Sequence, residues 1–282
     1  MKNDPVLTAW RTWQYAQSLS IRTVGSRIET IERFGQALRC HPKDATIDDV
    51  VEWLAKGEHW RPSTRRTYYK ALVAWFKWLQ RAGHRLDNPM VQVPPPKVPR
   101  AVPRPVTNAN LRRVLATRMH KRTRVMILLY AFAGLRCSEI AAIRGENFDL
   151  VERTVTVTGK GGVTATLPLH PLIMEAAWSM PRTGYWFPSN ASTNEPHLLG
   201  HSVGTIIKRV MIRAGVQGSA HCLRHWFGTE LVSAGVDLRT TQELMRHASL
   251  ATTAVYTQIA DARKAEGVER LDPWRSSEGT AA

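Results

Sequence analysis

The sequence predicts a mainly α-helical protein that has two domains and one small antiparallel β-sheet. Apolar residues recur at helical spacing over most of the 282 residues. This pattern breaks once, at Asn88 to Pro105, where the chain holds seven prolines in eighteen residues. Two short segments, 154–158 and 163–167, instead alternate with the period of a strand and carry β-branched residues. We therefore expect helices on both sides of the break and a hairpin in the second part.

Residues 1–88 are expected to form an all-α domain of about four helices. Three apolar residues lie on one face of an early helix: Val24, Ile28 and Ile31. Further along, Thr46 precedes Asp48 and Asp49, the pattern of a capped helix start with acidic residues in its first turn.

The clearest predicted helix covers 62–82, and Gly83 follows it as a C-cap. Its apolar residues cluster within about 100° of the helix circumference: Leu72, Trp75, Phe76 and Leu79. Its basic residues cluster within about 60° on the other side: Arg66, Lys70, Lys77 and Arg81. Such a stripe is either a solvated helix face or a binding surface, and the charge of the whole chain bears on the choice.

The chain carries a large surplus of positive charge. It has 39 Lys and Arg residues against 23 Asp and Glu, for a net charge of +16 and a pI near 10.4. Residues 1–100 hold 17 basic and 9 acidic residues, and residues 101–282 hold 22 and 14, so each part carries +8. A soluble protein of high pI is the plain alternative, but we expect a polyanionic partner, because neutralised phosphates release counterions. The basic stripe is then expected to lie along phosphates.

Residues 89–105 are expected to form a connector between the two domains. A run of prolines cannot continue a helix or enter a central strand, and it favours extended, fairly stiff chain. Lys97 and Arg100 make this connector basic, so we expect them to contact the polyanionic partner as well. The second domain is expected at 106–272, followed by a flexible tail at 273–282.

The second domain is predicted to be rich in helix apart from its hairpin. The strands at 154–158 and 163–167 flank the glycine-rich turn Gly159-Lys160-Gly161-Gly162. This arrangement places Lys160 at the hairpin tip. Trp186-Phe187 is expected to add a short third strand.

Other classes of protein are disfavoured by what the sequence lacks. Its three cysteines, Cys40, Cys137 and Cys222, are far apart and suit a reducing compartment. The longest apolar stretch, 125–135, is about half the length of a membrane span, and the N-terminus does not have the pattern of a signal segment. We expect a cytoplasmic protein with no membrane partner.

One cluster of residues carries chemistry: His221-Cys-Leu-Arg224-His225, followed by His247 and Tyr256. Arg224 offers a fork of donors that suits two phosphate oxygens, and His221 projects from the same side of a helix. The pair His221 and His225 has a spacing that could bind zinc, but no third ligand stands at a sensible distance, so we expect no metal.

The spacing of the whole set resembles that of the tyrosine recombinases, also called the phage integrase family. His221 through Thr229 is similar to the family's His-x-x-Arg box, and Leu244 through Tyr256 is similar to its histidine and nucleophile boxes. Gly134-Leu-Arg136-x-Ser-Glu139 resembles its first arginine box, and Lys160 falls at its β-hairpin lysine. The resemblance runs from about residue 107 to 271. It implies a core-binding helical domain followed by a catalytic domain of the DNA breaking-rejoining fold.

The resemblance implies that Tyr256 attacks a phosphodiester and forms a 3′-phosphotyrosyl link. Arg136 and Arg224 would bind the non-bridging oxygens, where negative charge develops. Because the covalent link keeps the bond energy, neither a metal, nor ATP, nor another cofactor is expected.

The same resemblance assigns roles to the remaining residues. His221 would accept the tyrosine proton, and Lys160 would protonate the leaving 5′ oxygen. His247 would hydrogen-bond a non-bridging oxygen, and Glu139 would orient nearby basic residues.

The expected function is site-specific integration or excision of a phage or mobile element. The implied partner is double-stranded DNA, bound as a homotetramer on paired core attachment sites, and a directionality factor is a possible further partner. The chain starts directly at the helical domain, so we expect a simple form without an arm-binding domain. A chromosome-dimer resolvase with the same chemistry, or a DNA-binding protein of this fold that does not cut, are the alternatives.

Two features depart from the family pattern. Arg246 stands where the family usually has a glycine before the histidine, which leaves the local backbone open. The hairpin also lacks the basic residues that often follow the lysine, which weakens the role given to Lys160.

Overall fold

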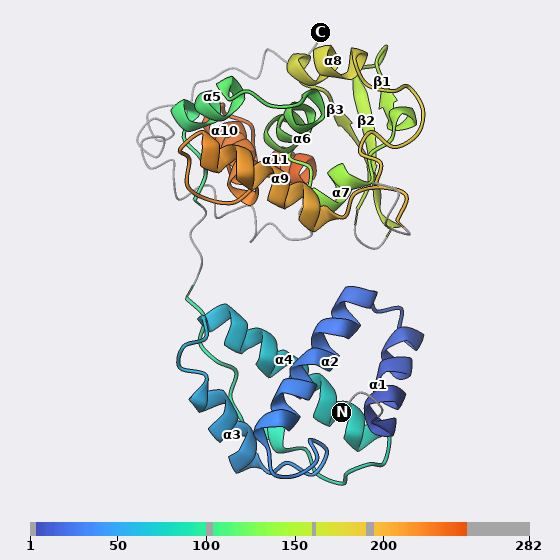
Figure 1. Cartoon of the computed structure of the whole chain (residues 1–282), viewed down its shortest axis with the longest axis vertical. Coiled ribbons are helices and arrows are strands. Elements are labelled where there is room, and N and C mark those ends of the chain that lie inside the picture. Colours follow the sequence, from blue (N-terminus) through green and yellow to red (C-terminus); the bar gives the residue numbers. More distant parts are fainter. Residues whose placement is uncertain (1–3, 100–103, 160–161, 190–194, 247–282) are drawn as a thin grey trace, which may run out of the picture. The chain divides into compact units, whose positions relative to one another are not determined.

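The computed structural model describes residues 4–99, 104–159, 162–189 and 195–246. It divides into two compact units, Met1–Ala101 and Val102–Ala282, each with its own hydrophobic core (Figure 1). The division falls inside the proline-rich stretch. In the described part of the chain the protein is mainly helical with one small antiparallel sheet, as the sequence predicts.

Four α-helices form the described part of the first unit: α1 (Pro5–Ala16), α2 (Ile21–Ala37), α3 (Ile47–Lys56) and α4 (Pro62–Arg81). The predicted helix start at Thr46 is confirmed. Its Oγ1 accepts the Asp49 N–H at 3.2 Å, and the Asp49 carboxylate accepts the Thr46 N–H at 2.8 Å. α4 ends one residue earlier than predicted, and Gly83 follows it with a φ of +74°.

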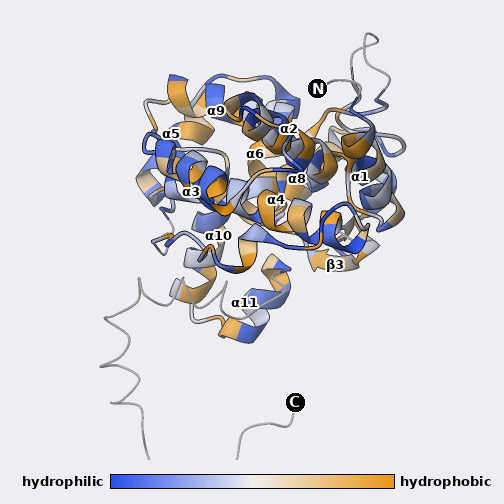
Figure 2. Cartoon of the chain, turned by 90° about the horizontal axis from the view of Figure 1, so that it is seen from below, coloured by the Kyte–Doolittle hydropathy of each residue, from blue (hydrophilic) through white to orange (hydrophobic). Residues whose placement is uncertain are grey.

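The core of the first unit is rich in tryptophan. Trp10 of α1 and Trp75 of α4 are fully buried, and their rings meet edge to face with centroids 5.0 Å apart. The predicted apolar face of α4 is buried throughout: Leu72, Trp75, Phe76 and Leu79. Lys70, Lys77 and Arg81 are exposed. The mixed hydrophilic and hydrophobic colouring along α1 and α4 in Figure 2 is that of amphipathic helices.

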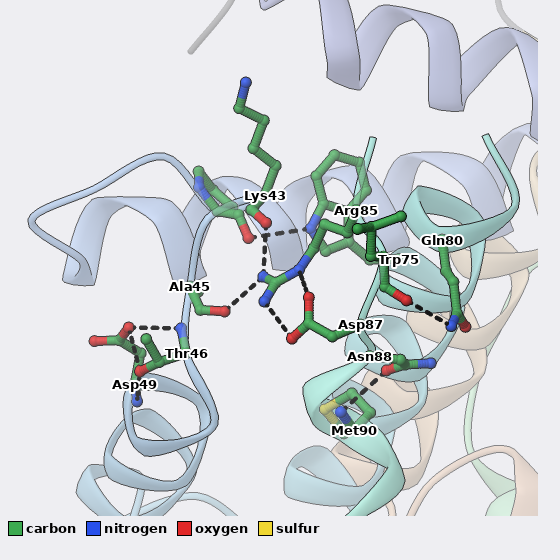
Figure 3. A network of polar contacts seen from close by, with 12 residues as sticks. Lys43, Ala45, Thr46, Asp49, Trp75, Gln80, Arg85, Asp87, Asn88 and Met90 are labelled. Carbon is green, nitrogen blue, oxygen red and sulfur yellow. Dashed lines mark hydrogen bonds and ion pairs between the residues drawn. The ribbon is translucent and has the colours of Figure 1, made fainter. Parts of the chain in front are cut away.

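Arg85 fastens the chain after α4 to the loop before α3 (Figure 3). Its Nη1 donates to the carbonyl oxygens of Lys43 and Ala45, both at 2.7 Å. Its Nε and Nη2 donate to the two carboxylate oxygens of Asp87 at 2.9 and 2.8 Å. One guanidinium therefore closes this end of the unit.

The predicted connector does not begin as free extended chain. A 3₁₀ turn, η1 (Pro89–Val91), lies within it, and Met90 and Val93 are buried in the core of the first unit. The Tyr69 hydroxyl donates to the Val93 carbonyl, and Arg66 Nη1 donates to the Pro96 carbonyl, both at 2.8 Å. The prolines exclude a helix as expected, but the apolar residues between them bind this segment to α4.

The second unit surrounds a central helix, α6 (Lys121–Phe132). Every residue from Val125 to Ala131 is buried, so α6 is apolar on all sides. It contacts α7, α8, α9 and α10. The other helical elements described are α5 (Asn108–Ala116), α7 (Cys137–Ala141), η2 (Gly145–Asn147), α8 (Pro171–Trp178), α9 (Gly200–Arg213), α10 (His221–Ser233) and α11 (Leu238–Met245).

The sheet has the order β1-β2-β3, and both pairs of strands are antiparallel. Its strands are β1 (Phe148–Asp149), β2 (Thr154–Thr158) and β3 (Thr164–Pro168). The hairpin is confirmed, but the third strand predicted at Trp186-Phe187 is wrong, because β1 holds that place. Trp186 instead stacks on Phe148 with ring centroids 4.0 Å apart, and its indole N–H donates to the Pro181 carbonyl.

Candidate strand-transfer site

Arg136 is placed by a tight turn that follows α6. Gly134 has a φ of +58°, and a Cβ at this position would lie 2.4 Å from Cδ1 of Phe227. Only glycine meets both the backbone and the space requirement. The turn connects α6 to α7, and Arg136 is the N-cap of α7.

The Arg136 guanidinium is held by two partners. Its Nη1 donates to Oε1 of Glu139, and its Nη2 donates to the carbonyl of Arg246, both at 2.8 Å. The Arg136 main-chain N–H donates to Oε2 of Glu139, also at 2.8 Å. The side chain nevertheless keeps 38% of its surface exposed, so it can meet a ligand.

Arg224, on α10, is almost completely buried, with 1% of its surface exposed. Its two terminal nitrogens donate to the carbonyls of Gly134 and Met245. These carbonyls belong to the turn after α6 and to the end of α11. Arg224 therefore joins three segments that are far apart in the sequence, and it lies beside the same turn as Arg136.

Arg246 completes this cluster, although no role was predicted for its side chain. It caps the C-terminus of α11 in the left-handed conformation, with a φ of +51°. Its Nη2 donates to Oε2 of Glu139 at 2.8 Å and to the Gly134 carbonyl at 3.1 Å, and its Nη1 donates to the Leu244 carbonyl at 3.0 Å. The departure from glycine noted in the sequence thus adds a guanidinium to the site.

Glu139 is the buried anion of the cluster, with 6% of its surface exposed. Burial alone raises the pKa of this carboxyl, but the charge of Arg246 and the hydrogen bonds and charge of Arg136 outweigh it. The pKa of Glu139 is therefore held below its ordinary value, and the group stays ionised. Glu139 binds both Arg136 and Arg246, and its predicted role in orienting basic residues stays a prediction.

His221 and His225 lie one helical turn apart at the start of α10, with ring centroids 4.5 Å apart. Partial burial of the imidazole, together with the charges of Arg224 and Arg136, lowers the pKa of His221. Burial and the charges of His221 and Arg224 lower the pKa of His225 to about 4. Both rings are therefore neutral at neutral pH. Although its imidazole is partly buried, residue His221 keeps enough exposed surface to accept a proton from a ligand.

The remaining predicted site residues lie outside the described part of the chain: Lys160, His247 and Tyr256. The described residues that directly precede Lys160 and His247 belong to the cluster. A Cβ on Gly159, the residue before Lys160, would lie 3.4 Å from Oε1 of Glu139. Arg246, the residue before His247, binds the same carboxylate.

Comparison with known proteins identifies the chain. Residues 106–263 match the phage integrase family. The chain is also 32% identical, over 239 residues, to the tyrosine recombinase XerA of Pyrococcus furiosus, covering 80% of this chain and 81% of the relative. This chain belongs to the phage integrase family.

Solved structures agree with this membership. The integrase-family chain is 57% identical to the integrase from mycobacterium phage Brujita, with 99% of this chain and 96% of that chain covered and a TM-score of 0.51. A lambda integrase dimer bound to a COC' core site shares the fold at 16% identity, with 98% of each chain covered and a TM-score of 0.72. Tyrosine recombinases as a family transfer DNA strands, and the predicted family and fold class are confirmed.

Beside His221, the integrase-family chain has a cavity of about 330 Å³ that the sequence did not reveal. Its polar lining comes from α6, α7, α9, the loop before α10 and the first residue of α10: Tyr130, Cys137, His201, Thr205, Lys208, Ser219 and His221. No motif in the sequence surrounds Lys208. It is the position of α9 in the fold that places Lys208 in the cavity beside His221.

A second basic cavity, of about 350 Å³, lies between α2 and α4 in the first unit. Arg22, Arg27 and Lys70 line it together with hydroxyl side chains. The sequence identified Lys70 but not the two arginines of α2. Of the other predicted DNA contacts, Lys77, Arg81 and Lys97 are exposed, Arg66 is half-buried on the Pro96 carbonyl, and Arg100 lies outside the described residues.

Within the described residues, no three His, Cys, Asp or Glu side chains gather in a way that could hold a metal ion. No helix in that part of the integrase-family chain is long and apolar enough to cross a membrane.

Proposed function

We propose that this chain is a site-specific recombinase that cleaves and rejoins double-stranded DNA through a 3′-phosphotyrosyl intermediate formed by Tyr256. The observation that carries the proposal is the meeting of Arg136 and Arg224 at one turn, Gly134, beside the end of α11. The two arginines are 88 positions apart in the sequence, and the chain that leaves this point leads directly to His247 and Tyr256.

The reaction needs positive charge where the phosphate gains negative charge. Arg136, which is partly exposed, is assigned the first contact with a non-bridging oxygen. Arg224 holds the Gly134 and Met245 carbonyls together in the free protein, and it contacts the phosphate when DNA displaces part of its cover. The net charge around the site favours the approach of the DNA backbone.

Proton transfer is assigned to residues with suitable ionisation. His221 is neutral at neutral pH because its pKa is lowered, so it can take the proton of the Tyr256 hydroxyl. Lys160 follows Gly159, which lies against Glu139, and it is assigned the proton that the leaving 5′ oxygen needs. His247 is assigned a hydrogen bond to a non-bridging oxygen.

Integration or excision of a phage or mobile element is the role that the comparisons favour. The identity to a mycobacteriophage integrase is 57%, against 32% to the XerA recombinase. We further propose a homotetramer on paired core sites as the assembly that exchanges strands, with direction set by the DNA sites or by a separate factor.

A nicked suicide duplex tests the nucleophile. The probe carries the chain's own attachment site with a nick close to the cleavage position, so that the cleaved fragment diffuses away and the covalent complex accumulates. The wild-type protein is expected to become linked to the DNA through the 3′ phosphate, whereas Tyr256→Phe is expected to bind the duplex without any link.

Two outcomes contradict the proposal. A covalent complex formed by Tyr256→Phe shows that another residue attacks the phosphate. A wild-type protein that binds its site but forms no link shows that the chain assembles on DNA without cutting it.

A further inference from the structure

The position of Arg246 is an unusual one for a long side chain. Its φ of +51° lies in the left-handed region, where glycine is strongly favoured because it has no Cβ. Only three non-glycine residues in the described part of the chain have a positive φ, and the other two, Ser18 and Arg153, lie outside the site. A strained position at a helix end suggests that the side chain itself is needed.

The Arg246 guanidinium is directed into the cluster of charges. It is 10% exposed, and it reaches Glu139, the Gly134 carbonyl and the Leu244 carbonyl. Its Nε is buried without a hydrogen-bond partner among the described residues. A buried guanidinium that lacks one hydrogen bond costs stability. Function therefore explains an arginine at this position better than folding does.

The charges of the site change with this residue. Arg136, Arg224 and Arg246 contribute three positive charges and Glu139 contributes one negative charge, which leaves a net charge of +2. Without Arg246 the net charge is +1, and the whole carboxylate charge of Glu139 acts on Arg136 at 2.8 Å. The attraction of Arg136 for a phosphate is then reduced.

We propose that Arg246 is a positioning residue of the strand-transfer site, whose guanidinium balances the charge of Glu139, so that Glu139 weakens the attraction of Arg136 for the DNA phosphate less. This inference rests on the proposed function. Arg246 acts through Glu139 and is not assigned a contact with the substrate. The Arg246 carbonyl also accepts the second hydrogen bond of Arg136, so the same residue fixes the guanidinium in place.

Two variants with the same backbone strain separate charge from shape. Arg246→Lys and Arg246→Gln both place a flexible side chain at the left-handed position, but only lysine keeps the charge. We expect the rate of covalent complex formation on the nicked duplex, at saturating DNA, to fall by about tenfold or more in Arg246→Gln and to recover in part in Arg246→Lys. Equal losses in the two variants would overturn the electrostatic role.

A double-mutant cycle with Glu139→Gln tests the route of the effect. Arg246→Gly suits the backbone and removes the side chain, and it is expected to slow cleavage in the wild-type background. In the Glu139→Gln background, where no carboxylate charge remains to be balanced, Arg246→Gly is expected to cause little further loss. Losses that simply multiply in the double variant show that Arg246 does not act through Glu139.

The ionisation of His221 gives a readout that does not depend on cleavage. The charge of Arg136 lowers the pKa of His221, so Arg246→Gln, which leaves Glu139 to offset that charge, is expected to raise this pKa in DNA-free protein, whereas Arg246→Lys is expected to change it less. The measurement is an NMR titration of the imidazole. The other charged or titratable groups near His221 are the same in both variants: Arg224, His225, Lys208 and His201.

This titration also separates the two proposals. If the wild-type protein forms no covalent complex, the proposed function fails, but a higher His221 pKa in Arg246→Gln than in Arg246→Lys still supports the charge balance. If the wild-type protein cleaves DNA and the two variants share one His221 pKa and one cleavage rate, only the inference about Arg246 fails.

Discussion

The two units of the molecule differ in how far their charged residues are exposed to water. In the first unit the core is rich in tryptophan, and Lys70, Lys77 and Arg81 of α4 stand at the surface, whereas Arg65 and Arg66 are half-buried. In the second unit the core is mainly aliphatic, and Glu139, Arg224 and Arg246 are removed from water at its edge. Exposed charges cost the fold little, whereas each buried one must be matched by hydrogen bonds. Exposed basic residues can therefore serve for binding with little loss of stability, whereas a reactive site made of buried charges lowers the free energy of unfolding.

The comparison predicts that charge removal has its largest effect on cleavage in the second unit. Arg136→Ala is expected to slow covalent complex formation by roughly 100-fold or more, because a donor to the developing charge is lost. Its effect on the dissociation constant of DNA is expected to be small. Single-turnover cleavage of the nicked duplex and a gel-shift titration measure the two effects.

Arg144→Ala is the matched control for this prediction. Arg144 is an exposed arginine of the same unit that is paired with Glu146 at 3.2 Å. It is expected to leave both cleavage and binding nearly unchanged. Equal losses of cleavage and binding in Arg136→Ala would make Arg136 a structural residue instead.

In the first unit, charge removal is expected to act on binding alone. Replacing Lys70 and Lys77 together by Gln should weaken DNA binding and reduce the slope of log K against log salt by about one for each lysine. Cleavage at saturating DNA is expected to stay at the wild-type rate. Lys56→Gln serves as the control, because this exposed lysine already pairs with Glu52. An unchanged salt slope in the double variant places this face of α4 away from the DNA.

The smallest expected effect is on stability at low pH, and it also arises in the second unit. The pKa of His225 is about 4 in the folded protein, below the ordinary value of 6.5. The unfolded chain therefore binds the proton more readily than the folded protein does. The contribution of neutral His225 to the free energy of unfolding is fully present above pH 6.5 and is lost as the pH drops towards 4. Solvent screening reduces the effect of this group to about 1 kcal/mol.

Urea unfolding of the second unit at pH 7 and pH 5 measures this loss. His225→Gln cannot take up the proton, so its loss of stability between the two pH values is expected to be smaller than that of the wild type. An equal loss in both proteins shows that other groups cause the dependence on pH.

Local patterns predicted most of the fold. The apolar and basic faces of 62–82 and the start at Thr46 follow from helix periodicity and capping, and the hairpin follows from alternation around a glycine turn. Each of these depends on residues that are close in the sequence. The strand predicted at Trp186-Phe187 failed because a partner strand is a tertiary choice, and Phe148–Asp149 took that place.

The site was predictable to the same extent. The motif residues Arg136, Glu139 and Arg224 could be predicted because their spacing resembles that of a known family, and they lie together in the structure. Lys208 and the reach of Arg246 to Glu139 depend on how α9 and α11 pack, and no pattern in the sequence records that. The departure from glycine at Arg246 was visible, but only its φ and its contacts give it a meaning.

The hydrogen bonds at the start of the connector also limit how far one unit can reach from the other. With Val93 and Pro96 held on α4, and Val106 bonded to the Cys222 carbonyl in the second unit, only residues 97–105 span the interval. Fully extended, nine residues cover roughly 30 Å. When one unit binds a duplex, the other is confined to a small volume around it, and its binding becomes an intramolecular event of high effective concentration. In a complex where both units bind one duplex, Tyr69 and Arg66 of α4 would contribute to this avidity, because their hydrogen bonds hold Val93 and Pro96 on the first unit.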